Sequence, residues 1–254
     1  MAFDAGFTAA VVEELSSQLL NARIEKIFQP SRDSVLLVLR RERSSLDPAG
    51  EKSVGCKLLI DAGAANPRLT LSDPEFDNPR VPPMFCMLLR KHLGGARITG
   101  LRTLGFERAA ELEFEARDEL GFLSKKYLYA EIMGKFSNLI FCGADRRILA
   151  AVKTNDLSSG SKRPILPGIP YTPPPPQEGK RSPLEEEKEA FLSAFRESAL
   201  PPAKFLLSRY SGLSPLLARE IAFRAGESDE ALWEEFSAVV ERIKKKDFLP
   251  VLLR

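Results

Sequence analysis

Short runs rich in apolar residues, separated by turn-forming residues, recur along most of the first 145 residues, which is typical of a β-meander. We expect an amphipathic helix first, over residues 9–21, with Thr8 as its N-cap. A short second helix is expected over residues 84–93, because prolines precede it and Gly94-Gly95 follow it. Strands are expected at residues 23–28, 34–41, 56–61, 68–71, 97–104, 109–116, 126–133 and 137–142, with a turn at 47–50.

Three alternating glutamates mark one of these strands. Glu111, Glu113 and Glu115 alternate with Leu112 and Phe114. Because successive side chains of a strand point to opposite faces of the sheet, the pattern predicts that one face is solvated.

The hydrophobic spacing changes to the helical period after residue 183. Before that point, residues 153–183 are rich in proline, which lacks the backbone donor of a central strand, so we expect a linker or an extended arm there. Helices are expected at residues 184–198, 202–210, 215–225 and 230–246. The predicted fold class is α+β, with a β-rich domain at residues 1–175, an all-helical domain at 176–247 and the apolar stub of a continuation at 248–254.

The chain is nearly neutral, so a basic surface can arise only from local segregation of charge. It has 37 Lys and Arg against 35 Asp and Glu, a net charge of +2. Between residues 86 and 108, however, several cations accompany the single anion Glu107. Cations at a helix end are stabilised by the helix dipole, whereas cations on strands and turns are not, so the second kind predicts a phosphate-binding patch. The first kind is Arg90, Lys91 and Arg97, and the second is Arg102 and Arg108.

Enzyme chemistry has little support in the sequence. The only histidine, His92, lies in an expected helix, and no nucleophile-elbow, phosphate-loop, zinc-protease or dinucleotide motif is present. The three cysteines are far apart and lie in apolar runs, which indicates buried thiols in a reducing compartment. The amino end lacks the pattern of a signal peptide, and no apolar run is long enough for a membrane span. We therefore expect a cytoplasmic protein with no catalytic site, metal, cofactor or membrane contact.

The segment LLSRYSGLSPLLARE, at residues 206–220, has the layout of a helix-hairpin-helix. Its turn contains Gly212, and Ser214 followed by Pro215 begins the next helix. Unpaired N–H groups at such a turn bind phosphate in nucleic-acid-binding proteins. Phosphate binding and plain helix packing are both compatible with this pattern.

Several segments together resemble one known family. They are MAFDAGFTAAVVEEL at the start, RIEKIFQP at 23–30, NPRVPPMFCMLLRKHLGG at 78–95, EIMGKFSN at 131–138 and ILPGIPYTPPP at 165–175. In collinear order over the whole chain, they are similar to the NFACT family, which includes proteins first called fibronectin-binding protein A.

The resemblance implies a function without small-molecule turnover. Family members bind the large ribosomal subunit that carries an obstructed peptidyl-tRNA, and they recruit tRNA, in bacteria alanine tRNA, to add a carboxyl-terminal tail to the stalled chain. The resemblance also implies an amino-terminal domain like that of formamidopyrimidine-DNA glycosylases, followed by a helix-hairpin-helix domain. Further coiled-coil and RNA-binding domains follow in the family, so this chain resembles the tRNA-binding head of a longer protein.

The functional residues of the family carry over only in part. The acid near the amino end corresponds to Asp4, and the Asp-Arg pair after the basic helix corresponds to Glu107-Arg108. The extra methylene of glutamate shifts the carboxylate, which puts tail synthesis in question.

A second family motif also departs from its usual form. EIMGRHSN reads EIMGKFSN here, with Lys135 and Phe136 replacing arginine and histidine and with Asn138 retained. Lysine loses the bidentate geometry of arginine toward phosphate. Phe136 is suited either to stacking on a base or to burial, and we expect burial. The predicted nucleic-acid-binding residues are Asp4, Arg90, Lys91, Arg97, Glu107, Arg108, Lys135, Asn138, Gly212 and Ser214.

Two alternative functions come from other classes. A surface adhesin for fibronectin is suggested by the older family name, although no secretion or anchoring signal is apparent. A DNA glycosylase-like DNA binder is suggested by the expected fold, but those enzymes use a processed amino-terminal proline followed by glutamate, and this chain begins Met1-Ala2-Phe3.

Overall fold

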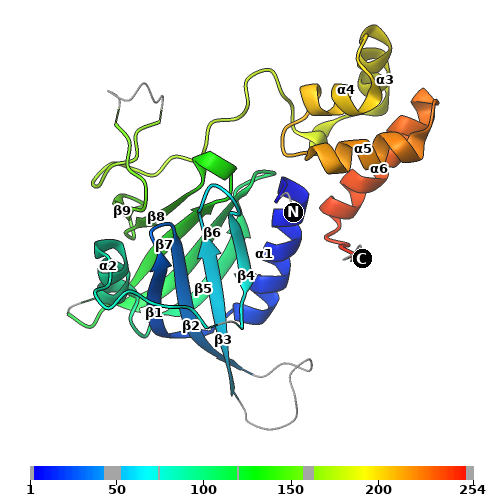
Figure 1. Ribbon diagram of the computed structural model, residues 1–254. Coiled ribbons are helices and arrows are strands. Elements are labelled where there is room, and N and C mark those ends of the chain that lie inside the picture. Colours follow the sequence, from blue (N-terminus) through cyan, green and yellow to red (C-terminus); the bar gives the residue numbers. More distant parts are fainter. Residues whose placement is uncertain (1–2, 43–52, 74, 119, 157–162, 250–254) are drawn as a thin grey trace. The chain divides into compact units, whose positions relative to one another are not determined.

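A computed structural model describes residues 3–42, 53–73, 75–118, 120–156 and 163–249 (Figure 1). The chain divides into two compact units. We call them the sheet unit, which comprises Val11–Leu104 and Ala109–Pro174, and the helical unit, which comprises Met1–Ala10, Gly105–Arg108 and Pro175–Arg254. The fold class is α+β, as the sequence predicted.

The sheet unit contains one antiparallel sheet of nine strands among the described residues, in the order β4-β3-β2-β1-β5-β6-β7-β8-β9. Consecutive strands are neighbours within each of two runs, β1 to β4 and β5 to β9, and the pairing of β1 with β5 joins these two meanders into one sheet. The strands are β1 (Arg23–Ser31), β2 (Ser34–Glu42), β3 (Ser53–Asp61), β4 (Arg68–Leu71), β5 (Arg97–Thr103), β6 (Ala109–Arg117), β7 (Leu123–Glu131), β8 (Asn138–Cys142) and β9 (Ile148–Ala151).

The pattern of short apolar runs located the strands well. Each of the strands predicted from the sequence is confirmed. The sequence did not predict β9, a four-residue strand (ILAA) without polar residues. The predicted turn at 47–50 lies outside the described residues. The core of the sheet unit is built from alternate apolar side chains that are almost fully buried, including Leu37, Leu58, Phe114, Leu128 and Phe141.

The two helices near the amino end differ in how well their limits were predicted. Helix α2 (Met84–Leu93) has the predicted limits, and the Cys86 N–H donates to Gln29 Oε1 of β1 at 3.1 Å. Helix α1 (Ala5–Leu19) begins earlier than predicted, because Asp4 and not Thr8 caps it. The Phe7 N–H donates to Asp4 Oδ1 at 2.8 Å, which satisfies one of the free donors of the first turn.

Residues 163–174, part of the segment expected to be a linker or an extended arm, pack on the sheet unit. Arg147 and Pro170 form an isolated β-bridge, and the ring of Tyr171 stacks on Tyr129 with 3.6 Å between centroids. Proline removes backbone donors from this segment but leaves its other side chains free to pack. The stacking of Tyr171 and the buried ion pair of Arg163 with Glu131 therefore hold this segment on the sheet unit, although its composition alone indicated an extended arm.

The prediction of a solvated glutamate face is wrong for Glu111, whereas Glu113 and Glu115 are partly exposed. Glu111 is only 1% exposed, and its carboxylate pairs with Arg102 and Arg146. Glu113 pairs with Lys125 of β7 at 2.9 Å. A buried carboxylate needs paired cations and hydrogen bonds, and the sequence pattern does not reveal that Arg102 of β5 and Arg146 of the β8–β9 turn reach Glu111.

The helical unit has a core of aromatic side chains. Phe191 contacts Phe205, Tyr210, Trp233 and Phe236, with ring centroids between 5.0 and 6.2 Å apart. The elements are η3 (Pro183–Glu185), α3 (Lys188–Glu197), α4 (Pro202–Arg209), α5 (Pro215–Ala225) and α6 (Asp229–Lys244). All four predicted helices are confirmed, although the first is divided into a 3-10 turn and α3, with residues 186–187 between them.

Candidate nucleic-acid interface

Asp4 links the amino end of the chain to helix α5 within the helical unit. Its Oδ2 accepts a hydrogen bond from the Ser214 hydroxyl at 2.6 Å, while Oδ1 caps α1 through the Phe7 N–H. Ser214 is the N-cap of α5, and its Oγ accepts from the Leu217 N–H at 3.2 Å. A carboxylate is favourable here because both helices present the positive ends of their dipoles.

Gly212 in the α4–α5 turn is pressed against two other segments of the helical unit. It has a φ of +77°, and a Cβ placed there would lie 2.7 Å from the Phe106 ring and 2.8 Å from the Ala5 Cβ. The Ala5 N–H donates to the Gly212 carbonyl at 2.9 Å. The glycine is therefore required both by its left-handed backbone and by the close approach of its neighbours.

The Phe106 contact positions the adjoining Glu107 and Arg108 in the turn between β5 and β6. Both side chains are half-buried. Burial raises the pKa of the Glu107 carboxyl above its ordinary value of 4.5, and the nearby Arg108 opposes this shift without cancelling it. The Arg108 guanidinium has no hydrogen-bond acceptor among the residues that the structure describes. Its side-chain donors are thus left for a ligand.

Half of the predicted binding residues are therefore brought together by the helical unit, from three distant parts of the sequence. The contacts of Ala5, Phe106 and Gly212 with one another hold these parts side by side. The residues are Asp4, Glu107, Arg108, Gly212 and Ser214.

The α4–α5 turn itself is less open than the sequence indicated. The Ser211 N–H donates to the Arg181 carbonyl at 3.0 Å, and the Leu217 N–H is occupied by Ser214. Moreover, the Asp4 carboxylate stands where an anion would approach the cap of α5. The geometry of this turn supports the packing alternative that its sequence left open.

The other predicted binding residues belong to the sheet unit and have diverse surroundings. Arg90 Nε donates to the Ile27 carbonyl at 2.8 Å, and its guanidinium lies 5.5 Å from the centre of the Phe28 ring. Lys91 is exposed on α2. Arg102, which the sequence placed in the same patch, is tied to buried Glu111. Arginines that look alike in the sequence thus differ in availability.

The EIMGKFSN motif contains both an internal and an exposed component. The Asn138 amide bonds the Lys153 backbone twice, with Nδ2 donating to the carbonyl at 2.7 Å and Oδ1 accepting from the N–H at 2.9 Å. Its contacts are therefore structural. Lys135 is exposed, with its ammonium 4.9 Å from the Phe136 ring. The expected burial of Phe136 is wrong, because 70% of this residue is exposed.

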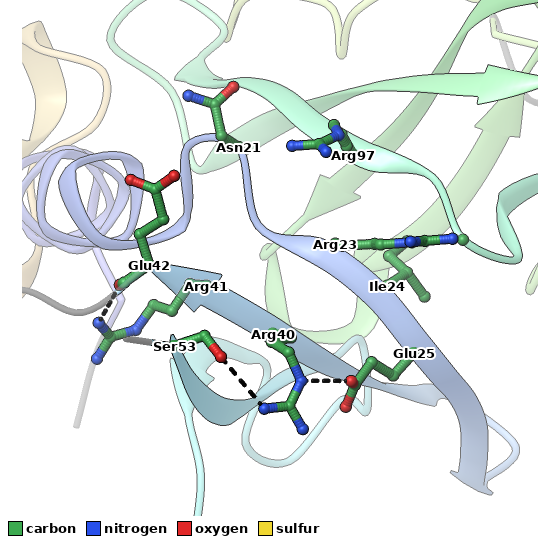
Figure 2. A pocket seen from close by; sticks show the side chains of 10 residues that line it. Asn21, Arg23, Ile24, Glu25, Arg40, Arg41, Glu42, Ser53 and Arg97 are labelled. Carbon is green, nitrogen blue, oxygen red and sulfur yellow. Dashed lines mark hydrogen bonds and ion pairs between the residues drawn. The ribbon is translucent and has the colours of Figure 1, made fainter. Parts of the chain in front are cut away.

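The structure adds Arg23, a cation that the sequence patterns did not single out. It lies opposite Arg97 in the only registered pair between β1 and β5, and opposite Arg40 of β2 (Figure 2). The three arginines line a hollow of about 510 Å³ in the sheet unit. A signal existed in the basic residue that opens RIEKIFQP, but the pairing of strands far apart in sequence was needed to see it.

The described part of the chain holds no group of three or more potential metal ligands. None of its helices has the length and apolarity that crossing a bilayer requires.

The chain belongs to the NFACT family, which confirms the resemblance seen in its motifs. The family model described as NFACT N-terminal and middle domains matches residues 4–254. Among curated relatives, the Rqc2 homolog RqcH of Bacillus subtilis is 35% identical over 98% of this chain, and that of Streptococcus pneumoniae is 34% identical over 87%. The chain spans only 42% and 38% of the lengths of these two relatives.

Solved structures of similar proteins show the same fold. The fibrinogen binding protein of Staphylococcus aureus matches 96% of this chain and 83% of its own, with 31% identity and a TM-score of 0.79. The N-terminal part of the fibronectin/fibrinogen-binding protein of Streptococcus suis matches 94% of this chain and 85% of its own, with 32% identity and a TM-score of 0.78.

Proposed function

We propose that this chain is the tRNA-binding head of a ribosome-associated quality-control factor. The factor would bind the large ribosomal subunit with its obstructed peptidyl-tRNA and support alanine tailing of the stalled chain in the cytoplasm. The relationship to proteins named Rqc2 homolog RqcH supports the process. The observation that carries the RNA-binding role is Arg108 beside Glu107: it has no ion-pair partner among the described residues, and it lies in a turn whose Phe106 packs against Gly212.

The proposed roles follow from the contacts within the helical unit. Arg108 donates to a tRNA phosphate, since its guanidinium donors are not used by any described acceptor and its turn is held by the contact of Phe106 with Gly212. The Glu107 carboxylate accepts a hydrogen bond from a ribose hydroxyl or orients the Arg108 guanidinium by its charge. Asp4 acts as a positioning residue, because both of its carboxylate oxygens are already engaged by Phe7 and Ser214.

The finer fold assignments belong to the same proposal. The sheet unit would correspond to the amino-terminal domain of formamidopyrimidine-DNA glycosylases, and α4–α5 to a helix-hairpin-helix. In this chain both would serve binding and not base excision, so no catalytic residue and no cofactor is assigned. Exposed Phe136 is proposed to stack on an RNA base, with Lys135 near its ring and available to a phosphate.

Fluorescence anisotropy with labelled alanine tRNA tests the central role of Arg108. Loss of a charged hydrogen bond to phosphate in Arg108→Ala should weaken binding about tenfold or more. It should also flatten the dependence of affinity on salt, because fewer counterions are released on binding. Arg219→Ala removes an exposed arginine of the same unit that bonds only its own helix carbonyl, and it should leave the affinity within about twofold.

Three outcomes are informative. Equal affinity of the wild-type chain and Arg108→Ala would remove Arg108 from the interface. Equal affinity for alanine tRNA and for another tRNA would confine the proposal to tRNA in general. Failure of the full-length protein to cosediment with large subunits that carry peptidyl-tRNA would contradict the quality-control role itself.

The names of the solved relatives favour a second candidate function, the binding of fibrinogen or fibronectin. Surface plasmon resonance with immobilised fibronectin tests it directly. Saturable binding that is unaffected by competing tRNA and by Arg108→Ala would support an adhesin surface separate from the RNA-binding one. Absence of binding at micromolar concentrations would dismiss it.

A further inference from the structure

Three arginines form a row across neighbouring strands of the sheet unit. Arg23 of β1 is in register with Arg40 of β2 on one side and with Arg97 of β5 on the other. Figure 2 shows their side chains around the hollow, with Arg40 directed to Glu25. Adjacent strands lie about 4.8 Å apart, so the row spans about 10 Å, more than one phosphate group occupies.

The arginines of this row differ in how their charges are compensated. Arg40 Nε bonds Glu25 Oε1 at 2.6 Å. Arg23 and Arg97 are exposed, and within the described ranges neither has a hydrogen bond or an ion pair to any side chain. Glu115 is in register with Arg97 on β6, yet the two do not pair within that part of the chain.

Stability of the folded chain does not account for this arrangement. Like charges placed opposite one another on adjacent strands destabilise a sheet. Here Arg23 has an arginine opposite it on both sides. Glu25 relieves part of this repulsion through Arg40, but no described acid pairs with Arg23 or Arg97, and such uncompensated arginines are expected where an external anion supplies the compensation.

Backbone geometry fixes the mouth of the hollow next to these two arginines. Gly95 has a φ of +74°, and a Cβ at that position would lie 3.3 Å from Arg23 Nη2. Asn21, on the other side of the hollow, also has a positive φ, of 67°, and donates its N–H to the Ile98 carbonyl at 2.8 Å. The glycine leaves space for the Arg23 guanidinium, so its position depends on the absence of a side chain at residue 95.

We propose that this hollow is a phosphate-binding site in which Arg23 and Arg97 together hold a phosphodiester group of an RNA strand. Arg40, kept in place by Glu25, lies beside the next phosphate along the strand. The length of the row and its open position favour a chain of phosphates over a single free ion. The choice of RNA rests on the proposed function, whereas the choice of phosphate rests on the arginines alone.

The binding test compares matched arginine substitutions in the complete 254-residue chain. Arg23→Gln and Arg97→Gln should each weaken binding of a labelled oligoribonucleotide about threefold to tenfold, and the double variant should reduce the salt dependence by the loss of about two phosphate contacts. Arg32→Gln is the control, because this exposed arginine follows the opposite end of β1, about 30 Å away. It should change the affinity less than about twofold.

Glycine substitutions test the shape of the hollow without removing a charge. Gly95→Ala should weaken RNA binding by displacing the Arg23 guanidinium. Gly121→Ala is its control, because Gly121 has a similar positive φ of +85° but nothing within 4 Å of its added Cβ. An equal effect of both glycine variants on affinity would contradict the proposed role of Arg23.

The source of the phosphate is decided by NMR of the arginine side chains. The Nε–Hε signals of Arg23 and Arg97 should shift on addition of the oligoribonucleotide, and less with inorganic phosphate at equal ionic strength. Shifts with inorganic phosphate alone would overturn the assignment to RNA. If the Arg23→Gln/Arg97→Gln double variant binds RNA as tightly as the wild-type chain, the proposed site is overturned but the proposed function stands. No RNA binding by the wild-type chain, together with the phosphate-induced shifts, would contradict the proposed function and keep only an anion site.

Discussion

Arginines serve opposite purposes in two regions of the same sheet. Near β7, the guanidinium of Arg163 makes a two-pronged contact with Glu131, a carboxylate that is only 2% exposed. Between β1 and β5, Arg23 and Arg97 are exposed and lack a carboxylate partner within the described residues. The charge of Arg163 is neutralised by a buried carboxylate within the fold, while the charges of Arg23 and Arg97 remain available to a ligand.

The difference shows why a count of basic residues misjudges a binding surface. Arg102 and Arg97 both belong to β5, yet Arg102 pairs with buried Glu111 and Arg97 does not. Only the partner decides whether an arginine stabilises the protein or is available to bind an anion. Stability and affinity measurements on the same variants should therefore separate the two groups.

The largest expected effect comes from breaking the buried pair. Arg163→Met leaves Glu131 without its cation, so it should lower the free energy of unfolding by about 3–5 kcal/mol. Three of the four tyrosines belong to the sheet unit, so tyrosine near-UV circular dichroism during urea unfolding follows this unit. Arg147→Met, which removes an exposed pair with Asp145 and an exposed hydrogen bond to the Gly168 carbonyl, should cost only about 1 kcal/mol. Similar losses for both variants would contradict the distinction between the two kinds of arginine.

The next effect concerns the turn that presents Arg108 in the helical unit. Gly212→Ala places a methyl group against Phe106 and Ala5 at a positive φ, and it should cost about 2–4 kcal/mol. Trp233 is the only tryptophan and packs in the core of the helical unit, so its emission follows this unit. Gly179→Ala, with a φ of +78° and no atom within 4 Å of the added Cβ, should cost about 1–2 kcal/mol. If both variants lost the same stability, the clamp formed by Phe106 would have no energetic role.

The sequence predicted what depends on near neighbours. Short apolar runs between turn-forming residues predicted strands β1 to β8. Prolines before α2 and glycines after it predicted both of its limits. Recognition of the family rested on motifs of eight to eighteen residues, such as EIMGKFSN, and it directed attention to Asp4 and Glu107-Arg108 before their proximity was known. That those residues come together in one unit could not be derived from spacing, because Phe106 and Gly212 are far apart in the chain.

The failed expectations share one physical cause, which is pairing between distant segments. Glu111 looked solvated because the sequence does not show that Arg102 of β5 and Arg146 of the β8–β9 turn reach it. The packing of Tyr171 on the sheet unit was not expected because its stacking partner Tyr129 belongs to β7. Arg23 was overlooked because its significance appears only in the register of β1 with β5. Local patterns report propensity, while long-range contacts decide which polar groups are buried.

The smallest expected effect separates two glutamates by their pKa values. Burial raises the pKa of Glu107, whereas the hydrogen bond from Lys125 lowers that of Glu113, so their carboxyl NMR titrations should fall on opposite sides of 4.5. Folded Glu107 holds its proton more tightly than unfolded Glu107, so its contribution to stability falls as the pH rises from about 4.5 through its folded pKa. Glu113 contributes stability above the ordinary pKa, and this is lost as the pH falls through its folded pKa.

Variants of the neighbouring cations show the cause of each shift. Arg108→Met should raise the midpoint of Glu107 further, because the opposing charge is removed, and Lys125→Met should move the midpoint of Glu113 back toward 4.5. Bound RNA should add a third change if Arg108 meets a phosphate, since an anion beside the guanidinium weakens its hold on Glu107 and raises that midpoint. If RNA does not change the titration midpoint of Glu107, Arg108 does not contact a phosphate. The RNA backbone would then be expected to bind at Arg23 and Arg97 of β1 and β5.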